Sequence, residues 1–207
     1  MAFIKNQTHK VIEVDERSQV RDCNTLIQDL AHPDPMVRRW AARDLADCKQ
    51  ASAALVDCLR NEQDMSVREI ILSTLTCLGD DDAIKGLVDC LRSEDAALRN
   101  ESIEVMKQLP DEVAPIMLEL LHDADPDVRI FAVNILESLR HPHVEAWLIE
   151  VITQDPVVNV CATALDLLVE VGSKASISAL QQLKNRFIDE PFIQFAVDLA
   201  LKRITEN

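Results

Sequence analysis

The sequence predicts an all-α protein: an α-solenoid of about six stacked helix pairs wound into a right-handed superhelix. Three observations lead to this prediction. A short phrase that combines an acid, an apolar anchor and an arginine returns every 30 or 31 residues. Apolar residues follow each anchor at helical spacing. Glycine is scarce, at 3 of 207 residues, as expected of a helical chain. A fixed period of this length is the signature of a stacked repeat architecture.

The repeated phrase occurs in five copies and a weaker sixth. In the first copy Asp34 precedes Pro35, and in the fourth Asp125 precedes Pro126. This pair starts a helix, because the carboxylate caps free N–H groups and proline suits the first helical position. Each phrase therefore predicts the start of a second helix, and the segment before it predicts a first helix. The apolar anchors are Val37, Val67, Leu98, Val128, Val158 and Ile193.

An arginine directly follows each of the first four anchors, one helical turn after the capping acid. We expect a ladder of ion pairs along the stack, in which each arginine bridges acids of its own repeat and of the next. Exposed ion pairs contribute little free energy, so such a ladder orients the repeats more than it stabilises them. The expected ladder comprises Asp34, Arg38, Arg68, Asp95, Arg99, Asp125 and Arg129.

The repeat pattern divides the chain into two parts. Residues 1–22 stand outside the repeats, and residues 23–207 form the predicted repeat domain. The leader contains a short apolar cluster, Val11 to Val14. A terminal segment of this kind is either flexible, or covers the first repeat, or binds a partner as an extended strand.

The charge of the chain excludes several classes of partner. Its 36 acidic and 21 basic residues give a net charge of −15. A general nucleic-acid binder needs a basic footprint, and anionic membrane surfaces attract basic segments. The longest apolar runs are too short to span a membrane, and the start of the chain lacks the apolar core of a signal peptide. We expect a soluble, cytoplasmic protein that binds neither nucleic acid nor membranes.

The six cysteines include no Cys-x-x-Cys pair. Cys58 and Cys90 occupy matched positions, and the corresponding position of the next two copies holds Leu120 and Val151. A position shared by cysteine, leucine and valine is a core position, where cysteine acts as a small apolar residue. We therefore expect buried, reduced thiols in a reducing compartment, in preference to redox or metal use.

The sequence offers no catalytic motif. His141, Pro142 and His143, with Glu145 nearby, resemble a metal site, but proline extends the link and a second ligand pair is lacking. A surface turn is the favoured interpretation. The scattered serines and threonines form no nucleophile motif, and a glycine-rich phosphate loop is absent. We predict no catalytic residue, no metal and no cofactor.

The phrase Asp-Pro-x-Val-Arg-x-x-Ala, at a step of about 30 residues, resembles the HEAT-repeat family. In particular it is similar to the short bacterial HEAT-like repeats of the phycobilin lyase type, over roughly residues 23–201. The resemblance implies adaptors and scaffolds, lyases of linear tetrapyrroles, a di-iron hydroxylase or DNA alkyl-base glycosylases. The hydroxylases use His-Glu dipeptides as ligands and this chain contains none. The acidic balance disfavours the glycosylases.

In HEAT-type stacks the second helices line the concave side, and positions two, five, six and nine after each anchor point there. On this basis the face is basic in the first repeat, mixed in the middle and apolar toward the C-terminus. We expect its apolar part to hold an apolar segment of another protein; burial by curvature and a homodimer contact are the alternatives. The predicted partner-binding residues are Arg39, Arg43, Glu69, Asn100, Glu104, Ile130, Val133, Asn134, Val160, Ala164 and Leu167.

The sequence therefore predicts a non-catalytic protein-protein interaction module, an adaptor or regulatory subunit that binds another protein on its concave face. The alternative is a phycobilin lyase or lyase subunit. Trp40 and Trp147 lie on apolar stripes, and core packing is the expected role of each.

Overall fold

The computed structural model describes residues 21–206. The predicted leader, residues 1–22, lies outside the described residues except for Arg21 and Asp22. Arg21 reaches over the first hairpin, where its Nη1 lies 3.0 Å from Asp29 Oδ2 and its Nη2 lies 3.4 Å from Asp44 Oδ2.

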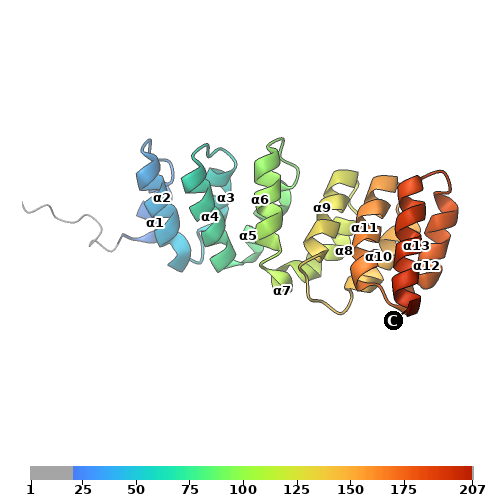
Figure 1. The fold of residues 1–207 in the computed structure, drawn as a ribbon. Helices are drawn as coiled ribbons and strands as arrows, with labels where there is room; N and C mark the ends of the chain where they lie inside the picture. The colour runs from blue at the N-terminus through green and yellow to red at the C-terminus, as the bar shows by residue number, and fades with distance from the viewer. Residues whose placement is uncertain (1–20, 207) are drawn as a thin grey trace, which may run out of the picture.

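The described residues form helices and no strands, which confirms the all-α fold. Six hairpins follow one another along the chain (Figure 1). The first three are α1 (Cys23–Asp29) with α2 (Pro35–Asp44) and η2 (Leu45–Asp47), α3 (Ser52–Leu59) with α4 (Met65–Leu78), and α5 (Asp81–Cys90) with α6 (Ala96–Met106). The last three are α7 (Pro110–Val113), η3 (Ala114–Ile116) and α8 (Met117–Leu121) with α9 (Pro126–Leu136), α10 (Val144–Gln154) with α11 (Val158–Val171), and η4 (Lys174–Ser176) and α12 (Ile177–Arg186) with α13 (Pro191–Glu206).

The hairpins stack into two layers. The second helices contact one another in the order α2, α4, α6, α9, α11 and α13, while first helices pack behind them, as α3 against α5 and α10 against α12. The hairpins form a row in Figure 1. We call the surface made by α2, α4, α6, α9, α11 and α13 the second-helix face. This arrangement is the predicted α-solenoid.

Aspartates begin four of the second helices, as the repeated phrase predicts. Asp34, Asp64, Asp95 and Asp125 are N-cap residues, and each accepts a hydrogen bond of 2.9 Å from the backbone N–H two residues later. Each cap satisfies a donor that the helix leaves unpaired and places negative charge at the positive end of the helix dipole.

The fifth repeat departs from this rule. The N-cap of α11 is Val157, which has no capping side chain, and Asp155 lies two residues before that N-cap. In α4 the buried positions begin at the anchor with Val67 and Arg68, but in α11 they begin with Val160 and Cys161. The structural anchor of the fifth repeat is therefore Val160, two residues after the predicted Val158.

The hydrophobic core runs through the whole stack, from Leu26 in α1 to Ile204 in α13. A hairpin cannot bury its apolar face alone, so each one contributes side chains that the neighbouring hairpin covers. Gly86 lets α5 approach α3 closely, because a Cβ added there would lie 2.2 Å from a methyl group of Val56. Gly79 ends α4 with a φ of 54°, a left-handed conformation that favours glycine.

The expectation of six reduced, buried thiols is wrong in two respects. Cys23 and Cys48 form a disulfide, with their Cα atoms 6.0 Å apart. Cys23 begins α1 and Cys48 follows η2, so the two ends of the first hairpin meet at its base. Cys77 is free but exposed on α4. Cys90 and Cys161 are free and buried, as core positions require.

Candidate functional site: the second-helix face

Arginines one residue after the anchor link each repeat to the next at three junctions. Arg38 Nε donates to Glu62 Oε2 at 2.7 Å, and Arg38 Nη2 donates to Oε1 at 2.8 Å. Arg129 forms the same two-point contact with Asp155, at 2.6 and 3.1 Å. These guanidinium groups also donate to carbonyl oxygens of the turn in their own repeat, Arg38 to the His32 oxygen at 2.8 Å.

The second junction uses different acids. Arg68 Nη1 donates to Asp95 Oδ2 at 2.9 Å, and its Nη2 lies 2.8 Å from Glu101 Oε2. Asp95 is therefore both the cap of α6 and the partner of the preceding arginine. The hydrogen bond from Arg68 is the main reason that the pKa of Asp95 lies below its usual value.

The third junction has no such pair. Arg99 Nη1 donates to the Ser93 oxygen at 2.6 Å, and its guanidinium carbon lies 5.9 Å from the ring centre of Phe131. Among residues 21–206 it forms no ion pair, and neither do Asp34 and Asp125, whose side chains cap α2 and α9. The structure thus brings Arg38, Arg68 and Arg129 against acids of the following repeat, and leaves Arg99 without one.

A groove of about 930 Å³ lies between α4 and α6 on the second-helix face. Leu72 and Val105 form an apolar floor that is almost buried, while Met65 is 59% exposed at one end. Glu69 and Glu104 line the groove from either side. The groove therefore combines apolar contact area with negative charge. Its further lining residues are Ser66, Ser73, Thr76, Cys77, Asn100, Glu101 and Gln108.

A smaller hollow of about 210 Å³ occupies the equivalent place between α9 and α11. Its acidic lining consists of Glu137, Asp166 and Glu170, beside Asn134 and Thr163. Burial raises the pKa of Asp166. The second-helix face thus remains acidic past the middle of the stack.

The predicted apolar binding patch is buried. Val133, Val160 and Ala164 have at most 1% of their surface exposed, and Leu167 has 9%. Because the anchor of α11 is Val160, these α11 side chains occupy the inward positions of the helix and pack on α9, α10 and α13. Val160 and Ala164 offer no surface to a partner, so the site prediction is wrong for these two, whereas Val133 and Leu167 line the floor of the hollow between α9 and α11.

The other predicted binding residues lie on the second-helix face. Arg39 and Arg43 are exposed on α2; Arg43 Nη2 lies 2.7 Å from Asp44 Oδ1, and its guanidinium carbon lies 4.2 Å from the ring centre of Trp40. Glu69, Asn100 and Glu104 are exposed, and Ile130 and Asn134 are partly exposed.

The last helix carries exposed apolar residues, of which Phe195 belongs to the predicted apolar end of the face, while Phe192 and Leu199 were not predicted. Phe192, Phe195 and Leu199 are 50%, 69% and 45% exposed, and their spacing of three and four residues places them on one stripe of α13. The signal was available, because these residues lie one before, two after and six after the anchor Ile193.

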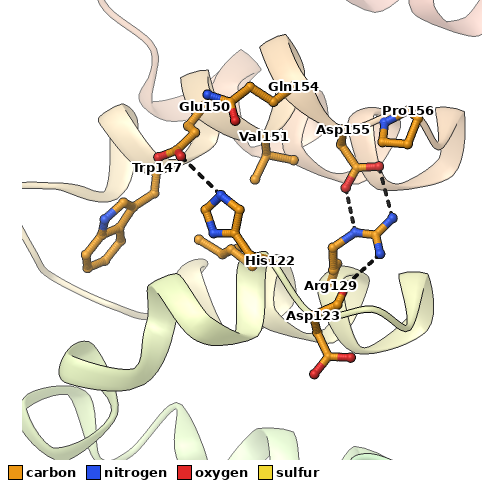
Figure 2. Close-up of a pocket in the computed structure, with 10 residues that line it drawn as sticks. His122, Asp123, Arg129, Trp147, Glu150, Val151, Gln154, Asp155 and Pro156 are labelled. Atoms are coloured by element: carbon orange, nitrogen blue, oxygen red, sulfur yellow. Dashed lines mark hydrogen bonds and ion pairs between the residues drawn. The ribbon is translucent and has the colours of Figure 1, made fainter.

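A pocket of about 290 Å³ lies between the fourth and fifth repeats, on the first-helix side (Figure 2). The Arg129–Asp155 pair closes one end of it, and His122 Nε2 lies 3.1 Å from Glu150 Oε1 near Trp147. In Figure 2 His122 points toward Glu150 and Arg129 points toward Asp155, while the Asp123 carboxylate points away from Arg129; the two contacts join the fourth repeat to the fifth. Nearby, His141 stacks on the Trp147 indole with ring centres 4.9 Å apart.

Within residues 21–206 no group of three or more His, Cys, Asp or Glu side chains is placed to hold a metal ion. In the same range, no helix has both the length and the apolar content that crossing a membrane requires.

Solved structures show a distant likeness to this chain. An archaeal HEAT-like repeats protein from Thermococcus onnurineus NA1 is 18% identical, with a TM-score of 0.47 over 86% of this chain and 85% of that one. Computationally designed armadillo repeat proteins for modular peptide recognition are 15% identical, with a TM-score of 0.44 over 87% of this chain and 99% of that one. A chain from the complex of CpcE and CpcF of phycocyanin lyase from Nostoc sp. PCC7120 is 16% identical, with a TM-score of 0.36 over 91% of this chain and 97% of that one. These likenesses carry no argument about function.

The sequence comparison gives the family. No curated protein matches the chain. The family model of HEAT repeats matches residues 23–107 and 113–191, which is most of the sequence; residues 1–22, 108–112 and 192–207 lie outside the match. The chain therefore belongs to the HEAT-repeat family.

Proposed function

We propose that this protein is a non-catalytic interaction module, an adaptor or regulatory subunit that holds a segment of another protein against its second-helix face. The observation that carries the proposal is the groove between α4 and α6. It offers about 930 Å³ of space with an apolar floor and polar walls, a composition typical of binding sites.

The rest of the face supports this assignment. Exposed residues continue along it on both sides of the groove, from Arg39 on α2 to Phe195 on α13. A stack of repeats presents such a surface as one extended platform, because each second helix lies beside the next. A partner segment that lies in the groove therefore meets a graded surface that is basic at one end, acidic in the middle and apolar at the other.

A groove-filling variant tests the proposal. Ser73 is exposed in the groove, and Ser73→Trp would occupy the space with an indole. Ala53 is exposed on α3, a first helix, so Ala53→Trp adds the same side chain away from the groove. Each tagged protein would be used for affinity capture from an extract of the native cells, after thermal unfolding has shown that both variants remain folded.

We expect a protein that wild type and Ala53→Trp both retain and that Ser73→Trp loses. The same proteins captured by all three would contradict the assignment of the binding face. A preparation that retains a pigment with visible absorbance, and no protein, would contradict the interaction module and favour a tetrapyrrole lyase.

A further inference from the structure

The second-helix face carries an excess of carboxylates between α4 and α11. Two cations pair with them: Arg68 Nη2 lies 2.8 Å from Glu101 Oε2, and Lys107 Nζ lies 3.1 Å from Glu104 Oε1 and 3.0 Å from Glu137 Oε2. One lysine shared by two carboxylates leaves a net negative charge on this stretch. The carboxylates are those of Glu69, Glu101, Glu104, Glu137, Asp166 and Glu170.

Three of these carboxylates lack a cation. Within residues 21–206, Glu69, Asp166 and Glu170 form no ion pair. Glu69 lines the larger groove, while Asp166 and Glu170 line the smaller hollow two junctions further along the stack. With Glu104 on α6 and Glu137 on α9, which share one lysine, these acids lie on four consecutive second helices, and this order matches a partner that supplies positive charge at successive repeats.

Two amides on the same face match an extended partner. Asn100 lies in the groove beside Glu104, and Asn134 lies in the hollow beside Glu137. Neither side chain forms a hydrogen bond within the described residues. The backbone of an extended segment needs such partners for its N–H and C=O groups, whereas a helix pairs these groups internally.

We propose that the second-helix face from α4 to α11 binds an extended cationic segment of the partner protein, with Lys or Arg at about every third residue. The spacing follows from geometry: packed helices lie about 8–10 Å apart, and an extended segment in the polyproline II conformation rises about 3.1 Å per residue with three residues per turn, so that every third side chain points to the same side. Residues between the cations place apolar side chains on Leu72 and Val105. The inference rests on the proposed function and names the class of partner.

Synthetic peptides test the spacing directly. The first probe is a fluorescein-labelled peptide of about five Ser-Leu-Lys triplets, which places a cation at each repeat. The second probe has the same composition, but its lysines are collected at one end. The third is a helical peptide with lysine at about every seventh residue, because seven residues of a helix span about one repeat. We expect the triplet peptide to bind at least about tenfold more tightly than either of the others, measured by fluorescence anisotropy.

Charge reversal tests the site. Glu69→Lys and Glu104→Lys should each weaken the triplet peptide by about tenfold or more, and added salt should reduce the difference. Glu119→Lys makes the same change on α8, outside the groove, and should alter affinity by less than about twofold. Glu69→Gln removes charge without adding any and should give an intermediate loss. Equal losses in all variants, or tighter binding of the helical peptide, would overturn the proposal.

The captured partner separates this inference from the proposed function. If Ser73→Trp and Glu69→Lys both fail to capture the partner protein, the result supports both the binding face and the cationic segment. If Ser73→Trp fails to capture the partner while Glu69→Lys and Glu104→Lys capture it fully, the binding face is supported and the cationic segment is overturned.

Discussion

Two junctions of the stack use the same arginine position differently. At the junction of the fourth and fifth repeats, Arg129 is 9% exposed and makes a two-point contact with Asp155. At the junction of the third and fourth repeats, Arg99 is more exposed and meets no carboxylate. Both arginines donate to a carbonyl oxygen of their own turn, Arg129 to that of Asp123 at 2.7 Å. The difference therefore lies in the acid supplied by the following repeat.

The acid that corresponds to Asp155 in the fourth repeat is Asp123, and another arginine holds it. Arg92, from the turn after α5, donates to Asp123, with Nη1 3.1 Å from Oδ1. That hydrogen bond is the main reason that the pKa of Asp123 lies below its usual value. The first helix of the fourth repeat is also broken into α7, η3 and α8, with Pro110 and Pro115 in its first two pieces. Similar sequence phrases thus give different contacts where a neighbouring arginine competes for the acid.

The largest effect should come from breaking the buried pair. Arg129→Ala leaves Asp155 buried without its cation, and removing one partner of a buried pair costs about 3–5 kcal/mol. Urea unfolding followed by circular dichroism measures the loss. In the double variant Arg129→Met with Asp155→Leu most of the stability should return, because no charge is left buried. If Arg129→Ala lowered the free energy of unfolding by less than about 1 kcal/mol, the buried pair would contribute no more than an exposed ion pair does.

The next effect concerns the two ends of the stack. The first repeat is closed by the Cys23–Cys48 disulfide over 25 residues, and within the described residues the sixth repeat has no such link. Reduction of the disulfide by a dithiol should lower the free energy of unfolding by about 3 kcal/mol, because the unfolded chain regains the entropy that closing a loop of this length removes. Hydrogen exchange should rise in α1 and α2 and stay unchanged in α13. As a control, Cys77→Ser should lose the same stability on reduction as wild type does. Hydrogen exchange in α1 that stays the same before and after reduction would contradict the prediction.

The pH dependence of the first junction should be smaller but visible. The hydrogen bond from Arg38 is the main reason that the pKa of Glu62 lies below its usual value. A depressed folded pKa adds stability that is fully present above the unfolded pKa of about 4.3, and that is lost as the pH falls through the folded value. Glu62→Gln should therefore lose less stability than wild type between about pH 5 and pH 3. Parallel urea titrations measure this; equal losses would contradict the assigned role.

Most of the fold could be predicted from the sequence, because the repeat phrase encodes local physics. Asp34, Asp64, Asp95 and Asp125 all cap helices as their position before the apolar stripe predicts. The prediction failed at the fifth copy: Asp155 precedes Pro156 in the same way, but it pairs with Arg129 and accepts a hydrogen bond from the Val157 N–H, while Val157 takes the N-cap position of α11. That choice depends on a residue in another repeat.

The candidate site was less predictable for the same reason. A register error of two residues in α11 places buried side chains such as Ala164 on the predicted face, and moves the exposed Asp166 off it. The groove between α4 and α6 depends on how two helices pack, which a single-helix pattern does not contain. The disulfide was equally hidden, because six cysteines allow fifteen pairings and spacing does not select one.

The smallest effect should come from Arg99, and it decides whether the comparison of junctions holds. Arg99→Ala removes a hydrogen bond to the Ser93 oxygen and a distant contact with the Phe131 ring, but leaves no carboxylate unpaired. Because a partly exposed cation near an aromatic ring contributes little, we expect a loss of less than about 1 kcal/mol in urea unfolding. Arg92→Ala sharpens the test, since it frees Asp123 for Arg99. In that background Arg99→Ala should cost more than it does alone. A loss in Arg99→Ala as large as that in Arg129→Ala would show that the arginine acts through its own turn at both junctions, and that the acid of the next repeat adds nothing.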